Sequence, residues 1–172
     1  KTTGTSVSFT PPISLASQNT SGTTVSIKYT FATYNGTTSL GSNSYTKTCS
    51  IPASVKPSCS LSVSDDTENY NIYNGYIQGI SKFNVTVSGT MSYDSPILSY
   101  STSANGKTYT VSSFTTGIVT SSGSNSIKAT VTDKRGRNGS STLNVQVLPY
   151  SAPMITKMSA VRCDSEGNEN DQ

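Results

Sequence analysis

The sequence predicts an all-β protein built from antiparallel β-sandwich modules, and two observations carry this prediction. Apolar and polar side chains alternate over several segments, as they do in strands with one buried face and one face in water. Turn signals rich in Gly, Asn and Pro separate these segments at short intervals. No segment of useful length shows the 3.6-residue period of a helix.

The alternation is clearest over residues 124–147, which we interpret as two strands joined by a tight turn. The positions expected to face inward are Ile127, Ala129, Val131, Leu143, Val145 and Val147. The intervening residues 133–139 are polar, and Gly136 and Gly139 can take the positive φ angles of a hairpin turn. Such a hairpin is a common ending for an immunoglobulin-like sandwich.

The preceding segments can be fitted around this hairpin as one module over residues 58–148. Further strands are expected over residues 60–64, 82–89, 97–101 and 107–111, with a short edge segment over 114–118. Residues 65–79 are expected to be irregular and polar. Six or seven strands in about ninety residues are typical of an immunoglobulin-like β-sandwich.

Shorter β-patterned segments flank this module. Strands are expected over residues 5–11, 23–34 and 44–51, and these make only a thin core for an independent domain. Prolines at both ends of residues 52–57 predict an extended, stiff spacer, and residues 149–153 repeat this chemistry before an expected strand over 154–162. We therefore divide the chain into residues 1–55 (the latter part of a sandwich module or a small β domain), residues 56–149 (a complete immunoglobulin-like module) and residues 150–172 (the start of a further module).

Composition narrows the classes of partner. Hydrophobic residues make up 32% and charged residues 12%, which fits Ser and Thr on the solvent faces of strands better than it fits a disordered, highly charged chain. A net charge of +3 is too small to indicate nucleic-acid binding, and no apolar run is long enough to span a bilayer. Lys134, Arg135 and Arg137 form the only basic cluster, which we interpret as a solvated turn. Cys49, Cys59 and Cys163 are expected to be free thiols.

The sequence contains few residues that could catalyse a reaction. The chain contains no histidine, which excludes Ser-His-Asp and Cys-His catalysis within it. Asp94 and Asp133 are the only acids inside the strand-rich region, and both occupy ordinary turn positions for aspartate. We therefore predict that the chain is not an enzyme, has no catalytic residue and binds no cofactor.

The sequence offers candidates for two kinds of binding site, one for calcium and one for sugars. Acidic stretches could hold calcium through Asp65, Asp66, Glu68, Asp164 and Glu166, although their spacing departs from that of calcium loops, and we interpret them as solvated loops. The rings of Tyr70, Tyr73 and Tyr76 could stack on sugars. The alternative that we favour is that these tyrosines cover an end of the sandwich.

Several short motifs occur together in a fixed order. They are YIQGISK at 76–82, SYST at 99–102, NGKTY at 105–109, GSNS at 123–126, TDKRGR at 132–137, LPYSAP at 148–153 and RCD at 162–164. Over residues 50–170 this order resembles the tandem immunoglobulin-like modules of tail minor structural proteins from siphophages and prophages of Gram-positive bacteria. The resemblance implies a component of the virion tail, assembled in the bacterial cytoplasm, with no assigned catalytic residues.

The leading hypothesis is a non-catalytic module of a phage or prophage tail protein, acting as a spacer or as a host-surface presentation domain. Its expected partners are other tail proteins or copies of itself, with host cell-wall glycan as a further candidate, and neither nucleic acid nor a membrane. One alternative is an immunoglobulin-like repeat of an adhesin on the bacterial cell surface. Another is an ancillary carbohydrate-binding module of a wall-degrading enzyme.

Overall fold

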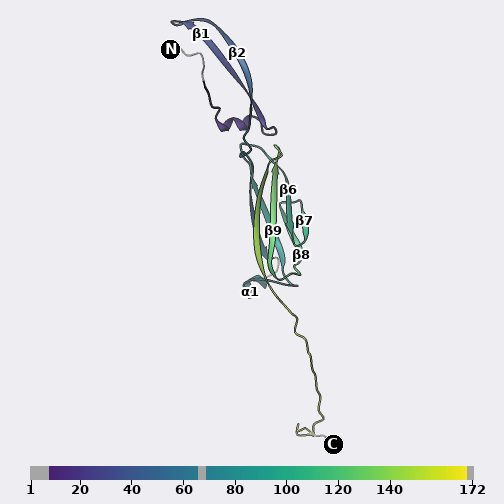
Figure 1. Cartoon of the computed structure of the whole chain (residues 1–172). Coiled ribbons are helices and arrows are strands. Elements are labelled where there is room, and N and C mark those ends of the chain that lie inside the picture. The colour runs from purple at the N-terminus through teal and green to yellow at the C-terminus, as the bar shows by residue number, and fades with distance from the viewer. Residues whose placement is uncertain (1–7, 66–68, 170–172) are drawn as a thin grey trace.

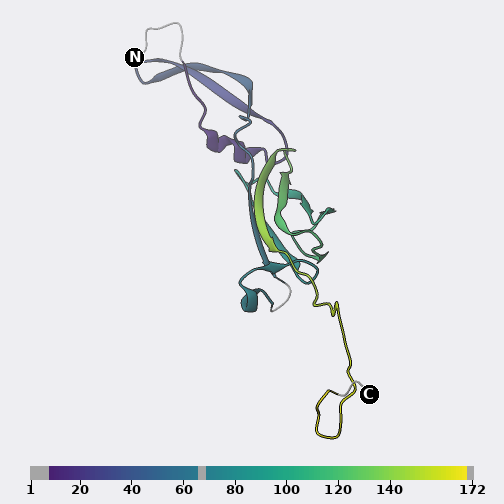
Figure 2. The same cartoon turned by 60° about the horizontal axis from the view of Figure 1, so that its bottom comes forward.

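A computed structural model describes residues 8–65 and 69–169 of the chain. Three parts follow one another along a single direction: a protruding β-hairpin, a β-sandwich and an extended C-terminal segment (Figure 1). Figures 1 and 2 both place the hairpin and the C-terminal segment at opposite poles of the sandwich. The described chain is thus elongated, with the sandwich in the middle.

The sandwich consists of two sheets that enclose one core. The smaller sheet has the order β3-β5-β8, made of Ser58–Asp65, Lys82–Thr90 and Ser113–Ile118. The larger has the order β4-β10-β9-β6-β7, made of Tyr76–Ile77, Asn138–Leu148, Gly123–Asp133, Ile97–Ala104 and Lys107–Tyr109. Every pairing is antiparallel except that of β4 with β10. This arrangement confirms the predicted all-β, immunoglobulin-like sandwich.

Alternating apolar residues from the two sheets fill the core. Phe83, Val85, Ile127, Ala129 and Val131 are each 0% exposed, which confirms the inward phases predicted for β5 and β9. In β10, the prediction holds for two residues, and Leu143 is instead 37% exposed. That side chain lines an open hollow at the surface with Val63 and Tyr70, so alternation alone could not place it.

The turn between β9 and β10 is closed by its own backbone. The N–H of Gly136 donates to the carbonyl of Asp133 at 2.9 Å, and Gly136 takes a φ of +76°, as predicted. Gly139 does not have a positive φ and is needed for another reason. A Cβ atom at Gly139 would collide with the carbonyl of Pro57, so this glycine lets two backbones approach closely.

A two-stranded hairpin and a short 3-10 helix form the N-terminal unit. The 3-10 helix η1 (Ile13–Gln18) precedes β1 (Thr24–Asn35) and β2 (Thr38–Ser50). The strand predicted over residues 44–51 is part of this longer β2. Of the strand predicted over residues 5–11, positions 5–7 lie outside the described residues and positions 8–11 form no strand. A small cluster of Ala16, Val25, Ile51 and Val55 holds the base of the hairpin.

The spacer predicted over residues 52–57 is not extended. It makes a turn in which the N–H of Val55 donates to the carbonyl of Pro52 at 3.1 Å. Ile51 and Val55 are only 5% and 3% exposed, because their apolar side chains pack into the base of the hairpin instead of facing water. The connection is a packed joint.

Two other expected segments also differ from the structure. Residues 154–162 form no strand, because no neighbouring strand lies beside them to pair with. The segment predicted to be irregular over residues 65–79 contains a short helix, α1 (Asn69–Tyr73), followed by β4.

Candidate functional site

The most elaborate polar arrangement in the described chain joins the sandwich to the N-terminal unit. Arg135, in the β9–β10 turn, is 7% exposed and donates four hydrogen bonds to backbone carbonyls. Its Nε donates to Asn19 at 3.1 Å and its Nη2 to Ala16 at 2.7 Å, both near η1. Its Nη1 and Nη2 donate to Ser92 at 2.8 Å and Tyr93 at 2.9 Å, in the β5–β6 turn. One planar guanidinium therefore ties three separate segments together.

A second arginine of the same turn fixes the connecting segment. Arg137 donates from Nη1 to the carbonyl of Val55 and from Nη2 to that of Ile51, each at 2.6 Å. The hydroxyl of Ser95 adds a bond to the carbonyl of Thr20 at 2.7 Å. We call Arg135, Arg137 and Ser95 the junction. The bonds that link the two β units run from side-chain donors of the sandwich to backbone acceptors of the N-terminal unit and its connection.

A left-handed turn of the sandwich presents the other two acceptors of Arg135, the carbonyls of Ser92 and Tyr93. Tyr93 has a φ of +45° and Asp94 a φ of +59°, both unusual for residues with a side chain. The N–H of Ser95 closes the turn on the carbonyl of Ser92 at 3.2 Å. Non-glycine residues in this region cost on the order of 1 kcal/mol each, and persist where the surroundings determine them. Here the strained turn directs its carbonyls at Arg135.

The prediction that the basic cluster is a solvated turn is thus wrong for two of its three residues. Lys134 is exposed, as expected, but Arg135 is buried and Arg137 is half-buried. The only sequence signal was the residue type, because arginine suits several simultaneous carbonyl contacts better than lysine does. Their acceptors are backbone atoms up to 119 residues away, which no side-chain pattern reveals.

The two core carboxylates considered for catalysis do not form a pair at the surface. Asp94 is exposed on its turn, whereas Asp133 is 0% exposed inside the β9–β10 turn. Asp133 Oδ1 accepts the N–H of Arg137 at 2.9 Å, and its Oδ2 has no partner among the described residues. This carboxylate shapes the turn that carries the junction.

The proposed calcium ligands occupy separate places, and nothing in the structure tests calcium binding itself. Asp65 Oδ2 accepts the hydroxyl of Ser81 at 2.6 Å, while Asp66 and Glu68 lie outside the described residues. Within residues 8–65 and 69–169, no three Cys, Asp or Glu side chains come close enough to hold a metal ion.

The C-terminal acidic stretch forms a small loop closed by its own amides. Asp164 Oδ1 accepts the N–H groups of Asn168 and Glu166, each at 2.9 Å, and these bonds lower the pKa of Asp164. The N–H of Gly167 closes a turn on the Asp164 carbonyl at 3.2 Å. Glu166 is exposed at the loop surface. Calcium binding by this loop stays a prediction.

The three tyrosines proposed for sugar contact have different environments. Tyr76 is 8% exposed, packs edge-on against Phe83 with ring centroids 5.2 Å apart, and donates its hydroxyl to the carbonyl of Val63 at 3.1 Å. Burial raises the pKa of Tyr76 to about 12, with smaller contributions from Tyr70 and Asp65. A ring buried in this way offers no face to a sugar, which corrects the prediction for Tyr76.

Tyr70 and Tyr73 remain accessible at this pole, at 39% and 58% exposure. Tyr73 borders a shallow hollow of about 200 Å³, whose other walls are Ile77, Ile80, Leu148, Pro149 and Tyr150. Tyr150 is 49% exposed and was not recognised in the sequence, because it follows a proline boundary and belongs to no alternating segment.

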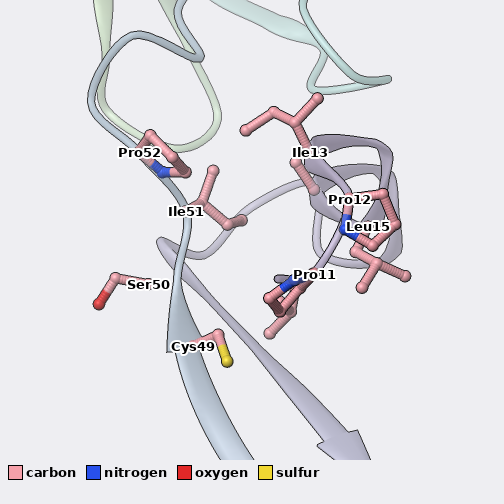
Figure 3. A pocket seen from close by; sticks show the side chains of 10 residues that line it. Pro11, Pro12, Ile13, Leu15, Cys49, Ser50, Ile51 and Pro52 are labelled. Carbon is pink, nitrogen blue, oxygen red and sulfur yellow. The ribbon is translucent and has the colours of Figure 1, made fainter. Parts of the chain in front are cut away.

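A second hollow, of about 170 Å³, opens at the base of the N-terminal hairpin. Its walls are almost entirely apolar (Figure 3), with Pro11, Pro12 and Leu15 on one side and Cys49 and Ile51 on the other. Because Val25 also lines it, the hollow lies directly beside the small cluster that supports the hairpin. The core of this unit is therefore open on one side.

Fold and junction together define a class of protein: an immunoglobulin-like β-sandwich that carries a second β unit on its β9–β10 turn. No helix in the described residues is long and apolar enough to cross a membrane. The chain belongs to the family described as "Siphovirus protein of unknown function (DUF859)", which matches residues 1–170. This confirms the siphophage part of the resemblance seen in the sequence.

Other comparisons add two solved structures. The chain is similar to the PKD1 domain of the Vibrio cholerae metalloprotease PrtV, with 22% identity and a TM-score of 0.41, covering 54% of this chain and 98% of that domain. It is also similar to the PKD1 domain of Vibrio anguillarum Epp, with 19% identity and a TM-score of 0.38, covering 52% and 93% of the two chains. No curated protein sequence matches the chain.

Proposed function

We propose that this chain is a non-catalytic structural module of a phage tail, in which the β-sandwich acts as a rigid spacer that joins or presents host-binding parts. The observation that carries the proposal is the junction. Four hydrogen bonds from Arg135 and Arg137 fix the N-terminal unit and its connection to the sandwich. A flexible tether between two β units would not need a buried cation at its joint.

The spacer role also fits the distribution of polar groups. The sandwich has an apolar core and solvent faces rich in Ser and Thr, and its buried Asp133 serves a turn. Membership of a siphovirus family favours the virion over a cell-surface adhesin or an ancillary module of a wall-degrading enzyme. The partners would be other tail proteins or further copies of the chain.

Antibody labelling of virions tests this proposal. Antibodies raised against the purified chain should decorate the tail of the parent phage in electron micrographs, and saturating amounts of the chain should not reduce adsorption to host cells. Decoration of the capsid alone, or no decoration of intact or opened particles, would overturn the proposed location.

One observation favours host-glycan recognition as a second candidate function. Tyr73 and Tyr150 are both exposed beside the same hollow, and aromatic rings at the rim of an apolar hollow suit the faces of sugars. Saturable binding to host cell-wall glycan, lost in Tyr73→Ala but kept in the control Tyr45→Ala, would support recognition. Tyr45 is a matched control because it is comparably exposed, at 62%, but lies in the N-terminal hairpin. Equal binding by all three proteins would reject this site.

A further inference from the structure

The N-terminal hairpin has two chemically different faces. Directly paired residues of an antiparallel sheet share a face, so the register defines both faces. One face, which we call the apolar face, consists of Val25, Ile27, Tyr29, Phe31, Tyr45, Lys47 and Cys49, with Thr33, Gly41 and Asn43 towards the tip. The opposite face consists of Thr24, Ser26, Lys28, Thr30, Ala32, Ser42, Ser44, Thr46, Thr48 and Ser50. Only the first face has the composition of a buried surface.

The apolar face is largely uncovered. Phe31 and Tyr45 are 60% and 62% exposed, and Phe9, which lies edge-on to Tyr29 at 6.2 Å, covers only part of the β1 side. The β2 strand is exposed along its whole length except at Cys49. A two-stranded sheet is marginally stable alone, and an open edge of this kind is a template for another strand. Among residues 8–65 and 69–169, the face therefore lacks a partner, most completely along β2.

A second element of the same chain exposes its apolar side chains. Residues 151–162, which we call the C-terminal segment, form no helix or strand. Its large apolar residues are among the most exposed in the described chain: Met154 at 79%, Ile155 at 80%, Met158 at 84% and Val161 at 56%. An extended segment of twelve residues spans about 40 Å, which matches the 13-residue β2 strand.

Charge and position make these two elements complementary. Residues 1–64 contain no Asp or Glu, and Lys47 lies on the apolar face. Asp164, Glu166 and Glu169 directly follow the C-terminal segment. Because the sandwich separates the two elements (Figures 1 and 2), they cannot meet within one copy.

We propose that the C-terminal segment of one copy adds as a strand to the β2 edge of a second copy and extends its apolar face. Backbone hydrogen bonds would hold the added strand. On that face, Met154 and Met158 would lie beside β2 residues such as Tyr45, and the strand would run towards the open hollow beside Val25 and Cys49. Such a contact is heterologous, so the copies assemble head to tail in an open series or a ring. The inference rests on the proposed spacer function in one respect: head-to-tail assembly would lengthen the spacer by repeating it.

Self-association of the full chain is the test. Sedimentation velocity should show oligomers that grow with protein concentration. Met154 and Met158 lie on one face of an extended strand. The double variant M154D/M158D should weaken association about a hundredfold or more, because it removes two large apolar side chains from the contact and adds two charges. The matched control M154L/M158L keeps both positions apolar and should associate as the original chain does.

Two further measurements identify the occupant. A synthetic peptide of residues 151–162 should compete with self-association and should slow amide hydrogen exchange in β2. Tyr45→Ser should weaken peptide binding, whereas Thr46→Ala, on the opposite face, should not. A chain that stays monomeric at the highest soluble concentration overturns the proposal. Association that is unchanged in M154D/M158D but lost in Tyr45→Ser also overturns it, and indicates packing of one hairpin on another. Neither result bears on whether antibodies label the virion tail, so the spacer function is tested separately.

Discussion

Replacing Arg135 by alanine should undock the N-terminal unit from the sandwich without unfolding the sandwich. The guanidinium makes four hydrogen bonds to carbonyls, and one acceptor, at Ala16, is buried. In the variant, this carbonyl would either stay dry and unpaired or pull its segment into water. None of the four acceptors belongs to the core of the sandwich, which includes Phe83 and Ile127. The variant should therefore leave this core folded.

The magnitude follows from the same contacts. An orphaned buried acceptor at Ala16 costs about 1–3 kcal/mol, and the part-buried bond to Asn19 contributes roughly 0.5–1.5 kcal/mol. The bonds to Ser92 and Tyr93 lie within the sandwich, so we expect a net loss of about 3 kcal/mol in the free energy of docking. At about 1.4 kcal/mol per factor of ten, local opening becomes more than a hundredfold more frequent.

Amide hydrogen exchange measures this opening directly. The N–H of Ile51, bonded to the carbonyl of Thr23 at 2.8 Å, and that of Val55 both report on the base of the hairpin. Their exchange should accelerate more than a hundredfold in Arg135→Ala, while amides of β5 and β9 keep their protection. Arg135→Lys should behave almost like alanine, because an ammonium cannot reproduce the planar arrangement of donors.

Lys134→Ala is the matched control for this experiment. Lys134 belongs to the same turn but is exposed, and it contributes only its backbone N–H, which donates to the carbonyl of Pro96 at 3.0 Å. Its side chain can be removed with no expected change in exchange. If Arg135→Ala changed exchange at Ile51 and Val55 by less than threefold, the proposed role of the junction would be refuted.

Three other predictions concern the junction and the opposite pole. Gly139→Ala should destabilise docking by about 2 kcal/mol or more, because its Cβ would meet the Pro57 carbonyl, and the same exchange measurement should reveal it. Asp94→Gly should raise the free energy of unfolding by about 1 kcal/mol in denaturant titrations, since glycine relieves the positive φ. Folding raises the pKa of Tyr76 to about 12. Its contribution to the free energy of unfolding should therefore be fully present below pH 10 and be lost as the pH rises from 10 towards 12.

Each of these predictions has a control in the chain. Ser140→Ala, at the exposed position next to Gly139, should leave docking unchanged. Asp94→Ala should bring no gain, because alanine keeps a Cβ at the positive φ; a gain equal to that of glycine would contradict the strain argument. Tyr76→Phe should lose the decline between pH 10 and 12, and a decline as large as in the original chain would assign it to another group.

The strands of the sandwich could be predicted from the sequence because each has one buried face. In β5 and β9 the two-residue alternation alone places Phe83, Val85, Ile127 and Val131 inward. The siphophage resemblance was also accessible, because it depends on the order of short motifs along the chain.

The junction could not be predicted, since its acceptors are backbone atoms without a sequence signature. Arg135 and Arg137 look like an ordinary basic turn until folding brings residues 16–19 and 51–55 beside them. The failed prediction for residues 154–162 has a related cause. Alternation predicts that a segment can pair, but a strand forms only where a neighbouring strand is present.

Residual dipolar couplings of backbone amides give the most direct test that the chain is a rigid spacer. In a weakly aligned sample, couplings from β1 and β2 and couplings from the sandwich report the orientation of each unit separately. If the junction locks the units together, one alignment tensor should fit both sets, and Arg135→Ala should require two. Two clearly different tensors in the original chain would mean that the units move independently, and would contradict the rigid-spacer account.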